Sequence, residues 1–152
     1  MLHWSFKAFS DLTPFELYEI LKARQAVFIV EQHCTYLDAD DYDQISYHLV
    51  GRSDAGEFLA YCRIVPPHTK YNEPSIGRVM TTAKGRGRGY GKLLMAEALS
   101  RLHLLYPNSP IRIGAQLYLE RFYNDFGFIR CSAPYDEDGI AHIEMLLCAK
   151  DT

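Results

Sequence analysis

The sequence lacks several patterns that would assign it to a functional class at once. No apolar run approaches the roughly 20 residues that a membrane-spanning helix requires. The four cysteines are scattered without a C-x-x-C pair, and the histidines show no ligand spacing, so nothing resembles a zinc site. Residues 1–10 are too short and too polar a segment for a secretion signal. We therefore expect a cytoplasmic protein with reduced thiols, no bound metal and no membrane partner.

An excess of positive charge is also missing. Lysine and arginine total 16 against 19 aspartate and glutamate residues, which gives a net charge of −3 and a pI near 6.0. A dedicated nucleic-acid-binding domain is usually basic, so this balance argues against a nucleic-acid partner. The run Arg86-Gly87-Arg88-Gly89 leaves RNA binding as an alternative, although it is a single copy bounded by strand and helix patterns.

Length and composition are those of one folded domain. A chain of 152 residues is about one domain long and can bury a substantial core. Its 48% hydrophobic and 13% aromatic residues exclude intrinsic disorder, and no repeat or low-complexity tract interrupts it. We therefore expect a single domain over residues 1–152.

Hydrophobic periodicity and turn residues predict three helices and seven strands. The first helix has a complete start signal, because Thr13 and Glu16 form a capping box and Pro14 occupies the first helical position. The predicted helices span 14–28, 93–106 and 118–126, and the predicted strands span 2–8, 46–50, 58–65, 76–82, 111–115, 128–131 and 140–148, with a turn at 133–139. This order predicts an α/β fold (α+β by some schemes), a mixed sheet with helices on both faces, and a parallel strand–helix–strand unit over residues 76–115.

An acidic segment follows the first helix and carries Asp38, Asp40, Asp41 and Asp43. A calcium loop of the EF-hand type would need a glycine and a final glutamate at fixed positions, and both are missing. Two interpretations stay open: a solvated loop, or a cation-attracting rim of a cleft for a basic substrate. The sequence also leaves open whether Arg24, Arg63 and Arg78 lie in that cleft or pair with these acids.

A glycine-rich loop between a predicted strand and a predicted helix carries the strongest functional signal. Lys84, Arg86, Arg88 and Lys92 place four cations and no acid within nine residues. Glycines let backbone amides approach a ligand, and a helix N-terminus offers unpaired N–H donors, so we interpret the loop as a phosphate cradle. The spacing fits neither the Walker motif nor the dinucleotide fingerprint.

The residues Arg86-Gly87-Arg88-Gly89-Tyr90-Gly91 match the pattern [QR]-x-x-G-x-[GA], and Tyr123 with Gly127-Phe128 matches a second pattern, Y-x-x-x-G-F, about 30 residues later. In this order and distance, the two motifs resemble those of the GNAT superfamily of acetyl-CoA-dependent N-acetyltransferases. The resemblance covers nearly the whole chain. Residues 24–32 with Cys34, Tyr36 and Asp38, and residues 138–145, are similar to the ElaA-like branch, whose acceptors are poorly defined. The resemblance implies the single-domain GNAT fold with a mostly antiparallel sheet.

The resemblance also implies the residues that bind acetyl-CoA, the acyl donor. A strand would pair with the pantetheine arm, the glycine loop would hold the pyrophosphate, and Gln116 stands where many family members have asparagine. The cofactor-binding residues so implied are Val79, Met80, Thr81, Arg86, Gly87, Arg88, Gly89, Tyr90, Gly91, Lys92, Gln116 and Tyr123. One departure concerns the start of the loop, where Ala83 replaces the common proline.

The implied reaction is direct attack of an amine, from a small molecule or a peptide, on the thioester in a ternary complex. Tyr123 would protonate the leaving thiolate, backbone N–H groups near Met80 would polarise the carbonyl, and Glu31 or His142 would accept the ammonium proton. Cys34 is a weaker candidate, because a cysteine nucleophile needs a base and an orienting group within reach. A non-catalytic acyl-CoA-binding or sensing protein on the same scaffold, and a homodimer, remain alternatives.

Overall fold

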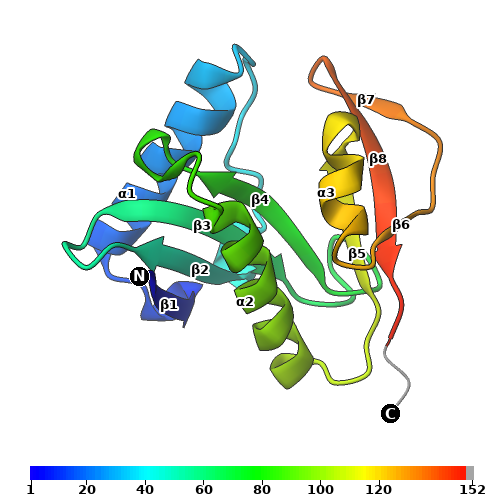
Figure 1. Ribbon diagram of the computed structural model, residues 1–152, viewed down its shortest axis with the longest axis horizontal. Helices are drawn as coiled ribbons and strands as arrows, with labels where there is room; N and C mark the ends of the chain where they lie inside the picture. Colours follow the sequence, from blue (N-terminus) through cyan, green and yellow to red (C-terminus); the bar gives the residue numbers. More distant parts are fainter. Residues whose placement is uncertain (150–152) are drawn as a thin grey trace.

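Two antiparallel sheets lie side by side and diverge towards the top of the view in Figure 1. The computed structural model describes residues 1–149. The first sheet has the strand order β1-β2-β3-β4 and the second has the order β5-β8-β6, with the short strand β7 also paired to β8. The strands are β1 His3–Ala8, β2 Tyr47–Arg52, β3 Phe58–Val65, β4 Ser75–Thr81, β5 Ile111–Gln116, β6 Ile129–Arg130, β7 Tyr135–Glu137 and β8 Ile140–Leu147.

Within residues 1–149, three α-helices connect and cover these strands: α1 Pro14–Arg24, α2 Tyr90–Leu105 and α3 Glu120–Asn124. The capping box at the start of α1 is confirmed, since the amide of Glu16 donates to Thr13 Oγ1 at 3.1 Å and the amide of Thr13 donates to the Glu16 carboxylate at 2.9 Å. Short 3-10 turns occupy Phe9–Asp11, Asp43–Ile45, Ala83–Gly85 and Leu117–Leu119. Of the helices described within residues 1–149, none is long and apolar enough to cross a membrane.

The alternation of side chains along β3 separates the core into two layers. Ala60, Cys62 and Ile64 belong to the larger layer, in which α2 packs across strands of both sheets. Tyr61 faces the other way and joins a smaller layer with Ile20 of α1 and with residues of β2 and β4. Helices therefore cover both faces, as the sequence predicts, and α2 holds the two sheets together.

The strand–helix–strand unit expected over residues 76–115 is present, but its two strands are not hydrogen-bonded neighbours. Each ladder described in the structure is antiparallel, and no ladder joins β4 to β5 within residues 1–149. A single bond, from the amide of Arg112 to the carbonyl of Pro74 at 3.1 Å, links the chain segments at the start of both strands. The expected single mixed sheet is thus divided, which leaves β4 and β5 as two facing edges.

Two local expectations also need correction. The first helix is expected to reach about residue 28, but its α-helical part, α1, ends at Arg24. The chain continues as a wider π-helical segment, Gln25–Glu31, in which Val27 and Phe28 are part of the core. The segment predicted as a turn at 133–139 contains the strand β7. Its actual turn is the dipeptide Asp138-Gly139, with φ angles of 53° and 83°, which pairs Glu137 with Ile140.

Candidate active site

A cavity of about 600 Å³ opens between the edges of β4 and β5. One wall is the segment 76–81 of β4, and the opposite wall is the segment 113–116 of β5 with the hairpin of β7 and β8. The π-helical segment after α1 contributes Glu31, and Gln32 follows directly after that segment. This cavity brings together Glu31, Val79, Met80, Thr81, Arg86, Gln116, Tyr123 and His142, which are far apart in the sequence.

The wall formed by β4 presents backbone groups to the cavity. Because β4 is the last strand of its sheet, the backbone groups along its outer edge have no strand partner within the described sheet. A β-bulge interrupts its pairing with β3, where Arg78 and Val79 together lie opposite Cys62 and Arg78 has a φ of 49°. Bulges re-aim neighbouring groups and are frequent beside active sites. The edge can therefore pair with an extended ligand.

The glycine loop fits the requirements of a phosphate cradle. Gly87 and Gly89 both have a φ of 76°, which side chains rarely adopt, and a Cβ at either position would point into open space. No side chain within residues 1–149 caps the first turn of α2, so the amides at 90–92 keep free donors. Of the loop, Arg86 lines the cavity, whereas residues 87–92 lie outside its wall.

The start of this loop is fixed without the usual proline. The amide of Thr82 donates to the carbonyl of Leu59 at 3.0 Å, and its hydroxyl donates to the carbonyl of Phe58 at 2.9 Å. A Cβ on Gly85 would lie 2.6 Å from the Leu59 carbonyl oxygen, so the loop crosses β3 at a distance that glycine alone tolerates. Contacts to β3 thus fix the backbone at the start of the loop, where Ala83 stands in place of the common proline.

Tyr123 lies in the wall of the cavity at the end of α3. Its ring packs at steep angles against Phe122 and Phe128, with centroids 5.1 and 6.1 Å apart. Only 6% of the residue is exposed, and its hydroxyl has no hydrogen-bond partner among residues 1–149. Burial raises the pKa of Tyr123, with a smaller contribution from the Cys62 thiol. The hydroxyl therefore keeps its proton at neutral pH, as a proton donor must.

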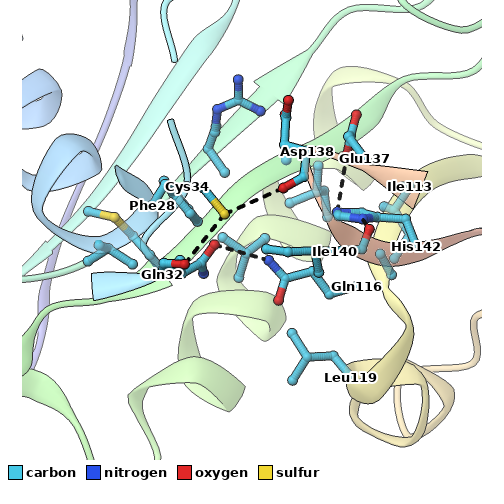
Figure 2. Close-up of a pocket in the computed structure, with 18 of the residues that line it drawn as sticks. Phe28, Gln32, Cys34, Ile113, Gln116, Leu119, Glu137, Asp138, Ile140 and His142 are labelled. Carbon is cyan, nitrogen blue, oxygen red and sulfur yellow. Dashed lines mark hydrogen bonds and ion pairs between the residues drawn. The ribbon is translucent and has the colours of Figure 1, made fainter. Parts of the chain in front are cut away.

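His142 comes from β8 and is 8% exposed. Its Nδ1 donates to the carbonyl of Ile140 at 2.8 Å, and its Nε2 lies 3.1 Å from the Glu137 carboxylate (Figure 2). The ring also stacks on Tyr135, with centroids 5.9 Å apart. Since the carbonyl can only accept, Nδ1 carries a hydrogen, and Nε2 is the ring nitrogen that faces the Glu137 carboxylate.

Glu31 is engaged by the glycine loop. Its carboxylate accepts a hydrogen bond from Nη2 of Arg86, and the same nitrogen donates to the carbonyl of Thr81 at 3.2 Å. Both side chains are partly exposed, at 37% and 45%. Arg86 is thus paired with Glu31 in the lining of the cavity, and this pairing leaves the carboxylate less available as a base.

Cys34 and Gln116 both line the cavity, and each has a hydrogen bond to Gln32 (Figure 2). The Cys34 thiol faces the carbonyls of Gln32 and Asp138, at 3.5 and 3.7 Å, and no imidazole within residues 1–149 bonds to it. It has neither a base nor an orienting group. The side-chain amide of Gln116 has one long bond, 3.5 Å to Gln32, so most of its donors and acceptors are free for a ligand.

The acidic segment forms neither a solvated loop nor a cation-attracting rim. Arg24 binds Asp38 and Asp43, Arg63 binds Asp40 and Asp43, and Arg78 binds Asp38 and Asp40, at distances of 2.6 to 3.2 Å. The three arginines therefore neutralise three of the four aspartates. Arg24 and Arg63 are almost completely buried. This Arg–Asp network anchors the segment 38–43 beside the cavity, and Asp41 alone among the four acids is exposed.

Several residues that shape the cavity were not identified from the sequence. The sequence predicts a turn at Glu137. The Asp-Gly dipeptide that follows Glu137 is a recognised hairpin signal, and a hairpin there brings Glu137 close to His142. Lys70, Tyr71 and Tyr135 also line the cavity, and no sequence pattern marks them. Within the part of the chain that the structure describes, no group of three or more His, Cys, Asp or Glu side chains could hold a metal ion.

Residues 22–148 match the Acetyltransferase (GNAT) domain family. This chain belongs to the GNAT acetyltransferase family. It is 38% identical over 147 residues to protein ElaA of Escherichia coli, with 95% of both chains covered, and 43% identical over 145 residues to UPF0039 protein sll0451 of Synechocystis, with 95% and 94% covered. The ElaA-like branch expected from residues 24–38 and 138–145 is thereby confirmed.

Solved structures agree with this GNAT assignment. An acyl-CoA N-acyltransferase from Pseudomonas aeruginosa superposes with a TM-score of 0.91 at 38% identity, covering 96% of this chain and 99% of that one. Escherichia coli ElaA superposes with a TM-score of 0.89 at 37% identity and the same coverage. The fold is that of the acyl-CoA N-acyltransferases, and an acyl-CoA-dependent acyltransferase role follows from the family.

Proposed function

We propose that the chain transfers an acetyl group from acetyl-CoA to the amine of a small molecule or a peptide, by direct attack within a ternary complex. The observation that carries the proposal is the cavity between β4 and β5, with the glycine loop at one end and the Tyr123 hydroxyl in its wall. A thioester supplies the acyl group in activated form, so the chain needs only to orient the reactants and move protons.

The binding roles follow from the free hydrogen-bonding groups. The edge of β4 at Val79, Met80 and Thr81 offers unpaired backbone groups to an extended pantetheine arm, and the amide of Gln116 faces it from β5. The open amides at 87–92 and the side chains of Arg86, Arg88 and Lys92 suit the pyrophosphate. A backbone N–H near Met80, beside the bulge, would face the thioester carbonyl oxygen, on which negative charge develops.

Proton transfer would use Tyr123 and His142. Attack of the amine nitrogen forms a C–N bond, cleavage of the C–S bond releases a thiolate, and the Tyr123 hydroxyl supplies the proton that the thiolate takes up. The proton lost by the amine passes to Nε2 of His142, directly or through water, with Glu137 stabilising the resulting imidazolium. We prefer His142 over Glu31 as the base because a proton on Nε2 gains the Glu137 carboxylate as a partner, whereas a proton on Glu31 would break its ion pair with Arg86.

The test is CoA release from acetyl-CoA in the presence of polyamines, amino acids, aminoglycosides and peptides, together with a thermal shift by acetyl-CoA. Binding should raise the melting temperature with ligand concentration. Gly89→Glu should abolish that shift, because it adds a bulky anion to the cradle. Gly56→Glu is the matched control, since Gly56 also has a positive φ, 85°, in open space but lies in the β2–β3 hairpin.

A non-catalytic acyl-CoA sensor would show the thermal shift and its loss in Gly89→Glu, yet release no CoA with any amine. No shift with acetyl-CoA, or equal loss of the shift in both glycine variants, would count against the cradle.

A further inference from the structure

The charges that line the cavity are nearly all paired with one another. Arg78 and Arg86 each pair with a carboxylate, and His142 lies beside the carboxylate of Glu137. Among the described residues, Lys70 and Asp138 are the lining charges without an ion-pair partner. One positive and one negative charge thus remain to be matched by whatever binds in the cavity.

The ammonium of Lys70 is held in place by aromatic rings. It lies 5.9 Å from the ring centroid of Tyr42 and 5.9 Å from that of Tyr71. Although much of the side chain is exposed, loss of solvent around the ammonium lowers the pKa of Lys70, and Arg63 and Arg78 lower it further. A positioned, partly desolvated cation gains more from an anionic ligand than a fully solvated one does.

Two tyrosine hydroxyls, one of them on the Tyr71 ring that the Lys70 ammonium approaches, converge on Gly114 of β5. A Cβ on Gly114 would lie 3.0 Å from the hydroxyl of Tyr135 and 3.2 Å from that of Tyr71. Neither hydroxyl has a hydrogen-bond partner within residues 1–149. Within the described residues, these two O–H donors without acceptors and the Lys70 ammonium without an ion-pair partner line the same cavity, and Glu137 and Glu144 are the acids near the two hydroxyls.

This site lies at the opposite end of the cavity from the phosphate cradle. Lys70 and Tyr71 precede β4, whereas the glycine loop follows it, and seven residues of extended strand separate the two ends. At about 3.3 Å a residue this is roughly 20 Å. The phosphates of acetyl-CoA, bound at the cradle, would lie too far away to pair with Lys70, so an external anion that pairs with it would come from the acceptor.

We propose that the acceptor is an amino acid or another amine that carries a carboxylate, and that Lys70 with the hydroxyls of Tyr71 and Tyr135 binds that carboxylate. Tyr135 stacks on His142, so a carboxylate at the Tyr135 hydroxyl places the attached amine beside Nε2 of the histidine. Asp138, adjacent to Glu137 at the hairpin turn, would attract the ammonium before it loses its proton. This inference rests on the proposed acetyltransferase function and names its class of acceptor.

The experiment compares four amino acids with their decarboxylated amines: L-lysine with cadaverine, L-histidine with histamine, L-tyrosine with tyramine, and L-phenylalanine with phenethylamine. For at least one pair, the wild-type kcat/KM should favour the amino acid. Lys70→Gln should reduce that preference by about 10- to 100-fold, the range for a hydrogen bond to a charged group. Because each amino acid and its amine are compared in both the wild type and the variant, their difference in basicity does not affect the change in preference.

Lys22→Gln is the matched control, because Lys22 is an exposed lysine of α1 outside the cavity, and it should leave the preference unchanged. Tyr71→Phe keeps the ring under Lys70 but removes one hydroxyl, and it should weaken the preference by several-fold. A wild-type protein that prefers no amino acid, or a preference that survives Lys70→Gln, would overturn the inference.

If no amine at all releases CoA, the acetyltransferase proposal fails and the carboxylate site is judged by binding. Calorimetric titration with the same pairs should then still show tighter binding of an amino acid, lost in Lys70→Gln. Equal binding of both members of each pair would rule the site out independently of turnover.

Discussion

Replacing Asp40 by asparagine should destabilise the protein by about 2 kcal/mol at neutral pH and by almost nothing at pH 2. Partial burial alone would raise the pKa of Asp40, but the hydrogen bonds and charges of Arg63 and Arg78 outweigh it and lower the pKa to about 2, from an ordinary value of 3.8. At roughly 1.4 kcal/mol for each pH unit, this shift corresponds to about 2 kcal/mol of folding free energy.

The direction of the pH dependence follows from the lowered pKa. Because the folded protein holds the Asp40 carboxylate in its charged form, the stabilisation is complete above pH 3.8 and is lost as the pH falls through about 2. Asparagine cannot replace the charged bonds at 2.7 and 2.8 Å, and it leaves the Arg63 guanidinium with Asp43 as its remaining acid. The variant should therefore lack this contribution at every pH.

Urea unfolding of both proteins at several pH values between 6 and 2.5 measures the effect. The difference between their unfolding free energies should shrink steadily below pH 4. Asp41→Asn is the matched control in the same segment: Asp41 is exposed with a φ of 68°, which asparagine tolerates, so its change should stay within about 0.5 kcal/mol. A difference that does not vary with pH would refute the ion-pair explanation for Asp40.

Three further predictions concern catalysis and cofactor binding. Tyr123→Phe should lower kcat 10-fold or more without changing acetyl-CoA affinity or melting temperature, because the ring contacts stay and no hydrogen bond within residues 1–149 is lost; an unchanged kcat would exclude the acid role. Glu31→Gln should tighten acetyl-CoA binding by a few-fold, since Arg86 is released to the pyrophosphate, whereas a 100-fold fall in kcat would identify Glu31 as the base. His142→Gln should lower kcat by about 100-fold near pH 7 and by less at high pH, where the amine is already neutral; a loss independent of pH would point to a structural role.

Local sequence signals predicted most of the elements and one part of the site. The capping box at Thr13, the glycine after α3 and the glycine loop each act through neighbouring residues, and each was found in the structure where expected. Tyr123 was placed in the site because its spacing to Gly127 matches a family pattern. Such features depend on the backbone of a few consecutive residues, so the sequence displays them directly.

The features that escaped prediction depend on contacts between distant segments. The separation of β4 from β5 is set by how α2 packs across both sheets, which no single segment encodes. Whether Asp40 is solvated or paired with Arg63 depends on contacts 23 residues apart. The pairing of Glu31 with Arg86 spans 55 residues, and it converts a candidate base into a partner of the cradle. The sequence shows the type and charge of each residue, but it does not show which distant residue each one pairs with.

The most direct test of the account is a crystal structure of the protein with bound CoA. The account predicts the pyrophosphate on the amides of residues 87–92, the pantetheine arm along the edge of β4 at 79–81, and the thiol within hydrogen-bond distance of the Tyr123 hydroxyl. CoA bound outside the cavity between β4 and β5, or a thiol directed away from Tyr123, would contradict it.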